Sequence, residues 1–172
     1  RVATLPAVRA GELASFATLN DLHFGEPRVG GVLDEDHEYG DEEKPGFPLI
    51  RESDTEIPYW RFMNADAVDE INAAGVDAAL IKGDIADRGE VEQFEEAAKV
   101  FAGFAMPHHA FLGNHDYLAL RRGEEVDGYA LLGQPAAPRS LDLGGWRLLL
   151  LETSLPGKHA GHLPSERRAW LA

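Results

Sequence analysis

The stretch VDAALIKGDIAD, residues 76–87, decides the fold, because it joins a largely apolar run to a glycine and two further aspartates. Val76–Ile81 predicts a short buried strand, and polar residues follow it at once. Helical apolar spacing occurs on both sides of this strand, over Asn64–Ala74 before it and Val91–Phe104 after it. The order helix, strand, helix indicates a mixed α/β chain.

Further elements extend this pattern in both directions. Phe16–Leu19 and Ala110–Leu112 are short strand candidates, and each is followed by polar residues. Strands that alternate with helices are typical of an α/β fold with a parallel sheet. The remaining predicted elements are a hairpin around a Gly-Gly pair and a last helix: Arg139–Leu143 with Trp146–Glu152, and Pro164–Leu171.

The composition indicates one acidic domain, or part of one, over residues 1–172. The chain is 44% hydrophobic and carries 30 Asp and Glu against 16 Lys and Arg, a formal net charge of −14. Such a surface repels phosphate backbones, so we expect no nucleic-acid-binding surface. Because the chain has no cysteine, any metal ion must bind His, Asp, Glu or Asn.

The negative charge is concentrated in one segment. Residues 33–56 hold ten acids against two basic residues, a net charge of −8, with neither helical nor strand periodicity. We therefore expect a long solvated acidic loop at about residues 26–58. It lacks the D-x-D-x-D-G spacing of a calcium loop, so a calcium site there is not favoured.

The chain shows no membrane or targeting signal. The longest apolar run, Leu148–Leu151, is far shorter than the roughly 20 residues of a membrane span, and no basic-then-apolar leader opens the chain. We expect a soluble protein. The first residue is Arg1 and not Met, so we expect that the natural N-terminus is absent, and the compartment stays unknown.

Oxygen and nitrogen donors follow each of the first three predicted strands. Because ligands bind at the carboxyl ends of the strands in open α/β sheets, these donors can converge on one site. Taken singly, the D-x-H motif could be a surface pair, the G-D motif a turn, and the third motif a helix N-cap. Together they indicate a metal or phosphate site. The three motifs are Asp21-Leu22-His23, Gly83-Asp84-Ile85-Ala86-Asp87 and Gly113-Asn114-His115-Asp116.

The order D-x-H, G-D-x-x-D, G-N-H-D resembles the calcineurin-like metallophosphoesterase superfamily. The final Asp116 resembles the phosphodiesterase and purple-acid-phosphatase-like branches, and residues 17–26 resemble bacterial members. The resemblance runs from about Phe16 to the end of the chain and implies part of a four-layer αββα sandwich. It also implies hydrolysis of a phosphomonoester or phosphodiester.

The resemblance implies a binuclear metal centre. Asp21 and His23 would hold the first ion, Asp84 would bridge both, and Asn114 would bind the second. The two divalent or trivalent ions could be Mn, Fe or Zn, and a hydroxide bridging them would attack phosphorus.

The third motif would supply the catalytic residues. The resemblance implies that His115 stabilises or protonates the leaving oxygen, while Asp116 holds the His115 imidazole in the required tautomer.

The chain departs from the family pattern near its end. A later lone His and a G-H-x-H motif are absent, and His159 and His162 are expected to be ordinary loop residues. We therefore expect an incomplete domain that lacks C-terminal strands and binds metal weakly. It would dimerise, or require a complementary C-terminal segment. The alternative function is a non-catalytic fragment or degenerate domain that binds a partner or a complementary chain.

Several other side chains have structural interpretations. His108 and His109 are expected to be surface or strand-entry residues. Arg88 could contact phosphate, form a salt bridge or lie at a helix start. We expect solvent exposure for His37 in the acidic loop. Core positions are expected for the tryptophans: Trp60, Trp146 and Trp170.

Overall fold

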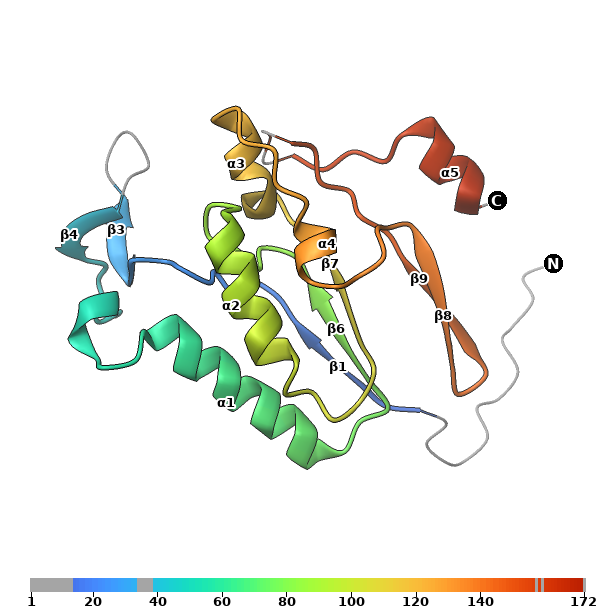
Figure 1. The fold of residues 1–172 in the computed structure, drawn as a ribbon, viewed down its shortest axis with the longest axis horizontal. Helices are drawn as coiled ribbons and strands as arrows, with labels where there is room; N and C mark the ends of the chain where they lie inside the picture. The colour runs from blue at the N-terminus through green and yellow to red at the C-terminus, as the bar shows by residue number, and fades with distance from the viewer. Residues whose placement is uncertain (1–13, 34–38, 157, 159, 172) are drawn as a thin grey trace.

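A small parallel sheet organises the protein (Figure 1). The computed structural model describes residues 14–33, 39–156, 158 and 160–171. The sheet has the order β1-β6-β7, and both pairings are parallel. Its strands occur where the sequence predicts them, with bounds that shift by at most two residues. They are β1 (Phe16–Leu19), β6 (Ala78–Lys82) and β7 (His108–Phe111).

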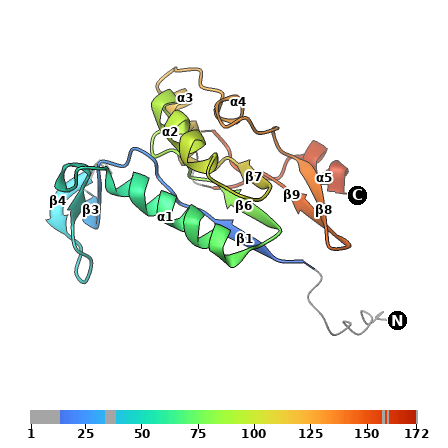
Figure 2. The same cartoon turned by 60° about the horizontal axis from the view of Figure 1, so that its bottom comes forward.

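Two helices form the crossovers between these strands. The helix α1 (Tyr59–Ala74) joins β1 to β6, and α2 (Val91–Phe101) joins β6 to β7. Both crossovers advance in the same direction across the sheet, so right-handed connections place both helices on one face (Figures 1 and 2). The core lies between these helices and the sheet. It includes Phe24, Ile81, Phe94, Phe101 and Ala110.

The helix α1 begins five residues before the predicted Asn64. Tyr59 and Trp60 are its first residues, and both are buried against the core. Four consecutive positions in this first part, 60–63, hold Trp, Arg, Phe and Met, which blurs the 3.6-residue pattern. The predicted end is confirmed, because Gly75 caps the helix in the left-handed conformation with φ 66°.

The acidic segment contains more structure than predicted. The expectation of no strand there is wrong, because two short antiparallel pairs and one 3-10 turn occupy it. Strands of two to five residues are too short to show alternation in the sequence. Residues 34–38, including His37, lie outside the described residues. The elements are β2 (Arg28–Val29) with β5 (Ile50–Arg51), β3 (Gly31–Leu33) with β4 (Tyr39–Glu43), and η1 (Glu52–Asp54).

The predicted hairpin and last helix are confirmed. The strands β8 (Arg139–Leu143) and β9 (Trp146–Leu150) pair antiparallel, and α5 (Ser165–Leu171) follows. Short helical turns connect β7 to this hairpin. They are η2 (His115–Tyr117), α3 (Leu118–Arg121) and α4 (Gly128–Leu131).

The tryptophan predictions divide between the core and the surface. Trp60 is buried, as expected, but Trp146 is 61% exposed and Trp170 is 40% exposed. The expectation of core positions for these two is therefore wrong. Trp146 lines an apolar groove, which we call the hairpin groove. The groove is lined by Ala14, Phe16, Leu143, Trp146 and Leu148.

The described residues form a mixed α/β fold, as predicted. The parallel sheet, its two crossover helices and the hairpin agree with the expected fold class. The four-layer sandwich remains a prediction. Within the described part of the chain, no helix has both the length and the apolar character needed to cross a membrane.

Candidate metal centre

The three sequence motifs meet at the carboxyl end of the parallel sheet. We call them the motif loops: residues 21–24, 83–87 and 113–116. The first two remain hydrogen-bonded beyond the ends of their strands. The backbone N–H groups of Leu22 and His23 both donate to the Asp84 carbonyl, at 2.8 and 3.0 Å, and Phe24 forms a parallel bridge with Ala86. His23 is thereby held beside Asp84.

The backbone of the first two motif loops is strained. Three residues other than glycine have positive φ in the described part of the chain: Asp21 at 56°, His23 at 43° and Asp84 at 50°. Such conformations are costly for residues with a Cβ atom, and they concentrate at functional sites. All three are residues that the family resemblance assigns to metal binding.

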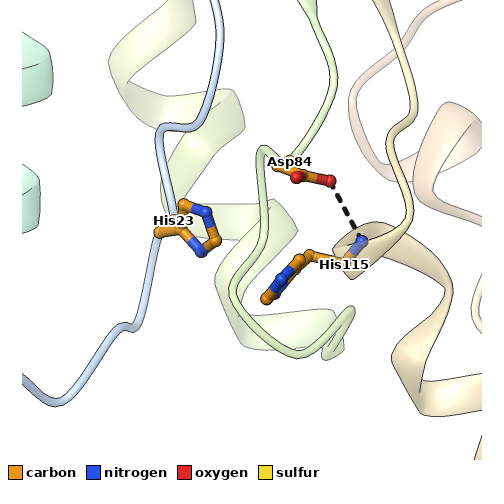
Figure 3. Close-up of side chains that lie close together, drawn as sticks. All are labelled: His23, Asp84 and His115. Carbon is orange, nitrogen blue, oxygen red and sulfur yellow. Dashed lines mark hydrogen bonds between the residues drawn. The ribbon is translucent and has the colours of Figure 1, made fainter. Parts of the chain in front are cut away.

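Each motif loop contributes one side chain to a compact donor group (Figure 3). His23, Asp84 and His115 each offer one ligand atom, and these atoms lie within 4.8 Å of one another. The two imidazole rings meet edge to face, with centroids 4.6 Å apart. The Asp84 carboxylate also accepts a hydrogen bond from the His115 backbone N–H at 3.0 Å. The predicted convergence of the three motifs is confirmed for these residues.

Two glycines allow the second and third motif loops to approach each other. A Cβ atom on Gly83 would lie 2.7 Å from Gly113 Cα, and one on Gly113 would lie 2.1 Å from Asp84 Oδ1. Both distances are far below van der Waals contact. These glycines make room for each other and for the Asp84 side chain.

Asp116 has a different role from the predicted one. Its carboxylate is 3% exposed and accepts hydrogen bonds from the backbone N–H groups of Ile85 (3.2 Å), Ala86 (2.7 Å) and Gly113 (2.8 Å). The predicted contact with the His115 imidazole is wrong. Burial raises the pKa of Asp116 to about 7, against the lowering effect of these N–H donors. Asp116 instead ties the second motif loop to the third.

Asp87 takes the role that was predicted for Asp116. The His115 Nδ1 atom lies 2.8 Å from the Asp87 backbone carbonyl, and the His23 Nδ1 atom lies 3.1 Å from Asp87 Oδ1. Asp87 is 1% exposed. Asp87 is the last residue of the G-D-x-x-D motif, so the sequence marked it as a candidate site residue. The spacing of the motif alone does not say which side chain it contacts.

Glu26 was also missed by the sequence analysis. His23, Glu26 and Asp87 form a second group of donors, again within 4.8 Å of one another, and Tyr59 donates to Glu26 Oε2 at 2.9 Å. Burial raises the pKa of Glu26. Burial also lowers the pKa of His23, but the hydrogen bond to Asp87 and the charge of Glu26 outweigh it, so the net shift is upward. The signal for Glu26 was its position three residues after His23.

Two further predicted ligands, Asp21 and Asn114, belong to the motif loops. Asp21 is exposed, and its carboxylate accepts a hydrogen bond from the neighbouring Asn20 amide. Asn114 is half-buried and directly precedes His115. It occupies the N-cap position of η2, as the helix-cap interpretation has it, but its side chain makes no capping hydrogen bond. Their roles as metal ligands remain predictions.

The residues with structural interpretations behave largely as expected. Arg88 Nε lies 3.7 Å from Asp87 Oδ2, which favours the salt-bridge interpretation. His108 and His109 are the first residues of β7 and are half-buried. His162 is exposed, with its backbone N–H donating to Thr153. His159 lies outside the described residues.

Comparison with known proteins agrees with this geometry. Residues 14–165 match the family described as Calcineurin-like phosphoesterase. The chain belongs to this family. It is 30% identical over 148 residues to the cAMP/cGMP dual specificity phosphodiesterase of Mycobacterium tuberculosis, which covers 75% of this chain and 45% of that protein. It is 29% identical over 92 residues to the 3',5'-cyclic adenosine monophosphate phosphodiesterase CpdA of Pseudomonas aeruginosa, which covers 54% and 32%. The chain spans less than half the length of both relatives.

The donors of this calcineurin-like phosphoesterase fit a metal ion. His23 and His115 offer imidazole nitrogens, and Asp84 offers carboxylate oxygens, a set that suits Mn, Fe or Zn. All three side chains are half-buried, so solvent competes less for them than it would at the surface. The family is generally metal-dependent, and this chemistry agrees with it.

A buried hydrogen-bond network connects the third motif loop to the hairpin. Glu152 follows β9 and is 4% exposed, and its two carboxylate oxygens accept hydrogen bonds from Tyr117 at 2.6 Å and Tyr129 at 2.5 Å. The Tyr129 hydroxyl in turn accepts from the Leu112 backbone N–H at 3.3 Å. Burial and the adjacent Glu152 raise the pKa of both tyrosines. Leu112 and Tyr117 flank the loop that carries His115, so this network fixes its position.

Proposed function

We propose that this chain carries the metal-binding half of a phosphodiesterase that hydrolyses a cyclic nucleotide, with two metal ions at the motif loops. The observation that carries the proposal is the convergence of His23, Asp84 and His115 on strained backbone. The substrate class is taken from the two relatives, whose names specify cyclic nucleotides. The proposed ligands are Asp21, His23, Asp84 and Asn114. His115, which lies beside them, is not a proposed ligand and is assigned to catalysis.

The charge of the chain requires added cations for this function. A phosphodiester is an anion, and the site itself presents the carboxylate of Asp84, with those of Glu26 and Asp87 beside it. Bound divalent ions supply positive charge and lower the pKa of water, so that hydroxide is available at neutral pH. Asp84 places its carboxylate between the two histidine-bearing loops, where it can neutralise such ions.

His115 is the proposed catalytic residue. A backbone carbonyl only accepts hydrogen bonds, so the contact with Asp87 O requires a proton on His115 Nδ1. The ring is thereby fixed with Nε2 available. In the protonated imidazole, Nε2–H can donate to the leaving oxygen of the ester, which stabilises the charge that develops there.

The test measures metal binding on this chain and hydrolysis on the whole protein that carries it. We expect weak binding of Mn²⁺ by the chain in calorimetry, and Mn²⁺-dependent hydrolysis of 3',5'-cyclic AMP by the whole protein. Asp84→Asn is expected to lower Mn²⁺ affinity by at least about 100-fold, because it removes the charge at the centre of the donor group. The matched control is Asp77→Asn, since Asp77 bonds the Ser15 backbone outside the motif loops. Undiminished Mn²⁺ binding and activity in Asp84→Asn would contradict the proposal.

One observation favours the second candidate, a fragment that binds a partner or a complementary chain. Trp146 is 61% exposed and lines the hairpin groove, and Leu149 is 47% exposed on the opposite face of β9. Exposed apolar patches commonly mark interaction surfaces. Under this alternative the chain alone either self-associates or becomes active only together with a complementary segment. Light scattering detects the self-association, and activity measurements with and without the segment detect the second case.

A further inference from the structure

Asp87 contacts both histidines of the candidate metal centre through two different parts of the residue. We propose that Asp87 is a positioning residue: its carboxylate sets the tautomer of His23, while its backbone carbonyl separately orients His115. This inference rests on the proposed function in one respect, because it takes His23 to be a metal ligand. The geometry at Asp87 stands independently of that role.

The contact with His23 determines which ring nitrogen is free. An ionised carboxylate accepts hydrogen bonds and cannot donate them, so the 3.1 Å contact with Asp87 Oδ1 places the proton of neutral His23 on Nδ1. The lone pair is then on Nε2. Metal-binding histidines commonly use one ring nitrogen for the ion and donate the other N–H to a carboxylate or carbonyl.

The backbone around Asp87 is fixed by contacts from three directions. The Asp87 N–H donates to the Phe24 carbonyl at 3.1 Å, next to His23. The Gln93 side chain accepts from the backbone N–H groups of Arg88 at 2.8 Å and Glu90 at 3.3 Å. Gly89, with φ 70°, packs against the Asp116 carbonyl so closely that a Cβ atom would lie 2.6 Å away. A change of the Asp87 side chain therefore leaves its carbonyl in place.

This division makes the two histidines respond differently to one substitution. Asp87→Ala removes the acceptor of His23 Nδ1–H but keeps the carbonyl that bonds His115 Nδ1. Asp87→Asn keeps an amide oxygen that can accept from His23. A purely structural role for Asp87 would disturb both rings together, and the conservative variant would not restore them selectively.

The experiment is nitrogen NMR of the metal-free chain labelled with ¹⁵N-histidine, at about pH 9, well above the ordinary histidine pKa of roughly 6.5. We expect Nδ1–H for both rings in the unsubstituted protein. In Asp87→Ala, His23 is expected to change to mainly Nε2–H while His115 keeps Nδ1–H, and Asp87→Asn is expected to resemble the unsubstituted protein. Asp77→Ala is the control for loss of a carboxylate outside the site.

Two results would overturn the proposal. One is a His23 ring in folded Asp87→Ala that keeps Nδ1–H, and the other is an equal change of both rings in Asp87→Ala and Asp87→Asn. Calorimetric titration with Mn²⁺ gives the second readout, with a 10- to 100-fold loss of affinity expected for Asp87→Ala, on the order typical of residues that orient metal ligands. If the unsubstituted chain binds no Mn²⁺, the proposed function fails, while the NMR result still decides the role of Asp87.

Discussion

At the motif loops, polar side chains lie on strained backbone that is fixed by hydrogen bonds, whereas in the β8–β9 hairpin apolar side chains lie exposed on regular paired backbone. Asp116 and Asp87 are almost fully buried at the first place, while Trp146 and Leu149 are exposed at the second. The difference shows that the two regions tolerate change differently. Gly83 and Gly113 in the motif loops leave no room for a Cβ atom, and the hairpin surface has few neighbours.

The sharpest test of this contrast compares two glycines, one from each region. Gly113→Ala would place a Cβ atom 2.1 Å from Asp84 Oδ1 and 2.4 Å from the Asp84 backbone nitrogen. Because backbone and a carboxylate must both move, we expect a loss of about 3 kcal/mol in the free energy of unfolding, with loss of Mn²⁺ binding. Urea denaturation and calorimetry measure the two effects.

The matched control is Gly145→Ala in the hairpin turn. Gly145 has φ 85°, but nothing lies within 4 Å of its added Cβ atom. Only the left-handed conformation opposes the substitution, at about 1 kcal/mol, and Mn²⁺ binding should be unchanged. Equal losses in the two variants would remove the distinction between the regions.

The second prediction concerns pH, and it is intermediate in size. Burial raises the pKa of Asp116 from an ordinary value near 3.8 to about 7 in the folded state. The folded protein therefore binds this proton more tightly than the unfolded chain does, and its stability falls as the pH rises from about 4 through 7. Each unit of pKa difference corresponds to roughly 1.4 kcal/mol, so we expect a loss of a few kcal/mol in the metal-free protein.

Urea denaturation at several pH values checks this slope. The upward pKa shifts of His23 and Glu26 act in the same direction, so Asp116→Asn should reduce the slope without abolishing it. An Asp116→Asn variant with the same slope as the unsubstituted protein would show that Asp116 stays ionised when buried. Its three N–H donors would then outweigh desolvation.

The smallest expected effect is at the hairpin surface. Leu149→Ser changes a side chain that is 47% exposed, so we expect the free energy of unfolding to change by no more than about 0.5 kcal/mol. Self-association should weaken, because apolar surface is removed. Light scattering over a range of concentrations measures it.

The adjacent residue provides the control for that result. Leu150 points to the other face of β9 and is 5% exposed, so Leu150→Ser should cost about 2 to 3 kcal/mol. If Leu149→Ser is as destabilising as Leu150→Ser, the hairpin surface is not free of packing, and the contrast with the motif loops is wrong.

Local pattern was sufficient to predict much of the fold. The apolar runs at Phe16–Leu19 and Val76–Ile81 identify strands because polar residues bound them, and the Gly-Gly pair identifies the hairpin. The start of α1 and the small strands of the acidic segment were missed. Their position depends on tertiary packing and on pairing between segments about twenty residues apart, as for Val29 and Ile50.

The convergence of the three motifs was predicted better than the contacts within them. The motifs at the strand ends correctly bring His23, Asp84 and His115 together, because parallel strands place their carboxyl ends at one edge. The contact of His115 with Asp87 instead of Asp116 could not be predicted, since Asp116 directly follows His115 in sequence and Asp87 belongs to another motif. Which carboxylate faces an imidazole and which faces backbone N–H groups depends on how the loops turn after the strands.

The Glu152 network also constrains the order in which the molecule can form. Its carboxylate anchors Tyr117, which lies 35 residues earlier, and Tyr129, which lies 23 residues earlier. During synthesis, the loop that carries His115 therefore emerges before the group that fixes it. Contacts of this separation slow folding, because the intervening chain must close a loop before they form. The parallel sheet can assemble early on the ribosome, but its third motif is expected to become fully ordered only once the hairpin strand has been made.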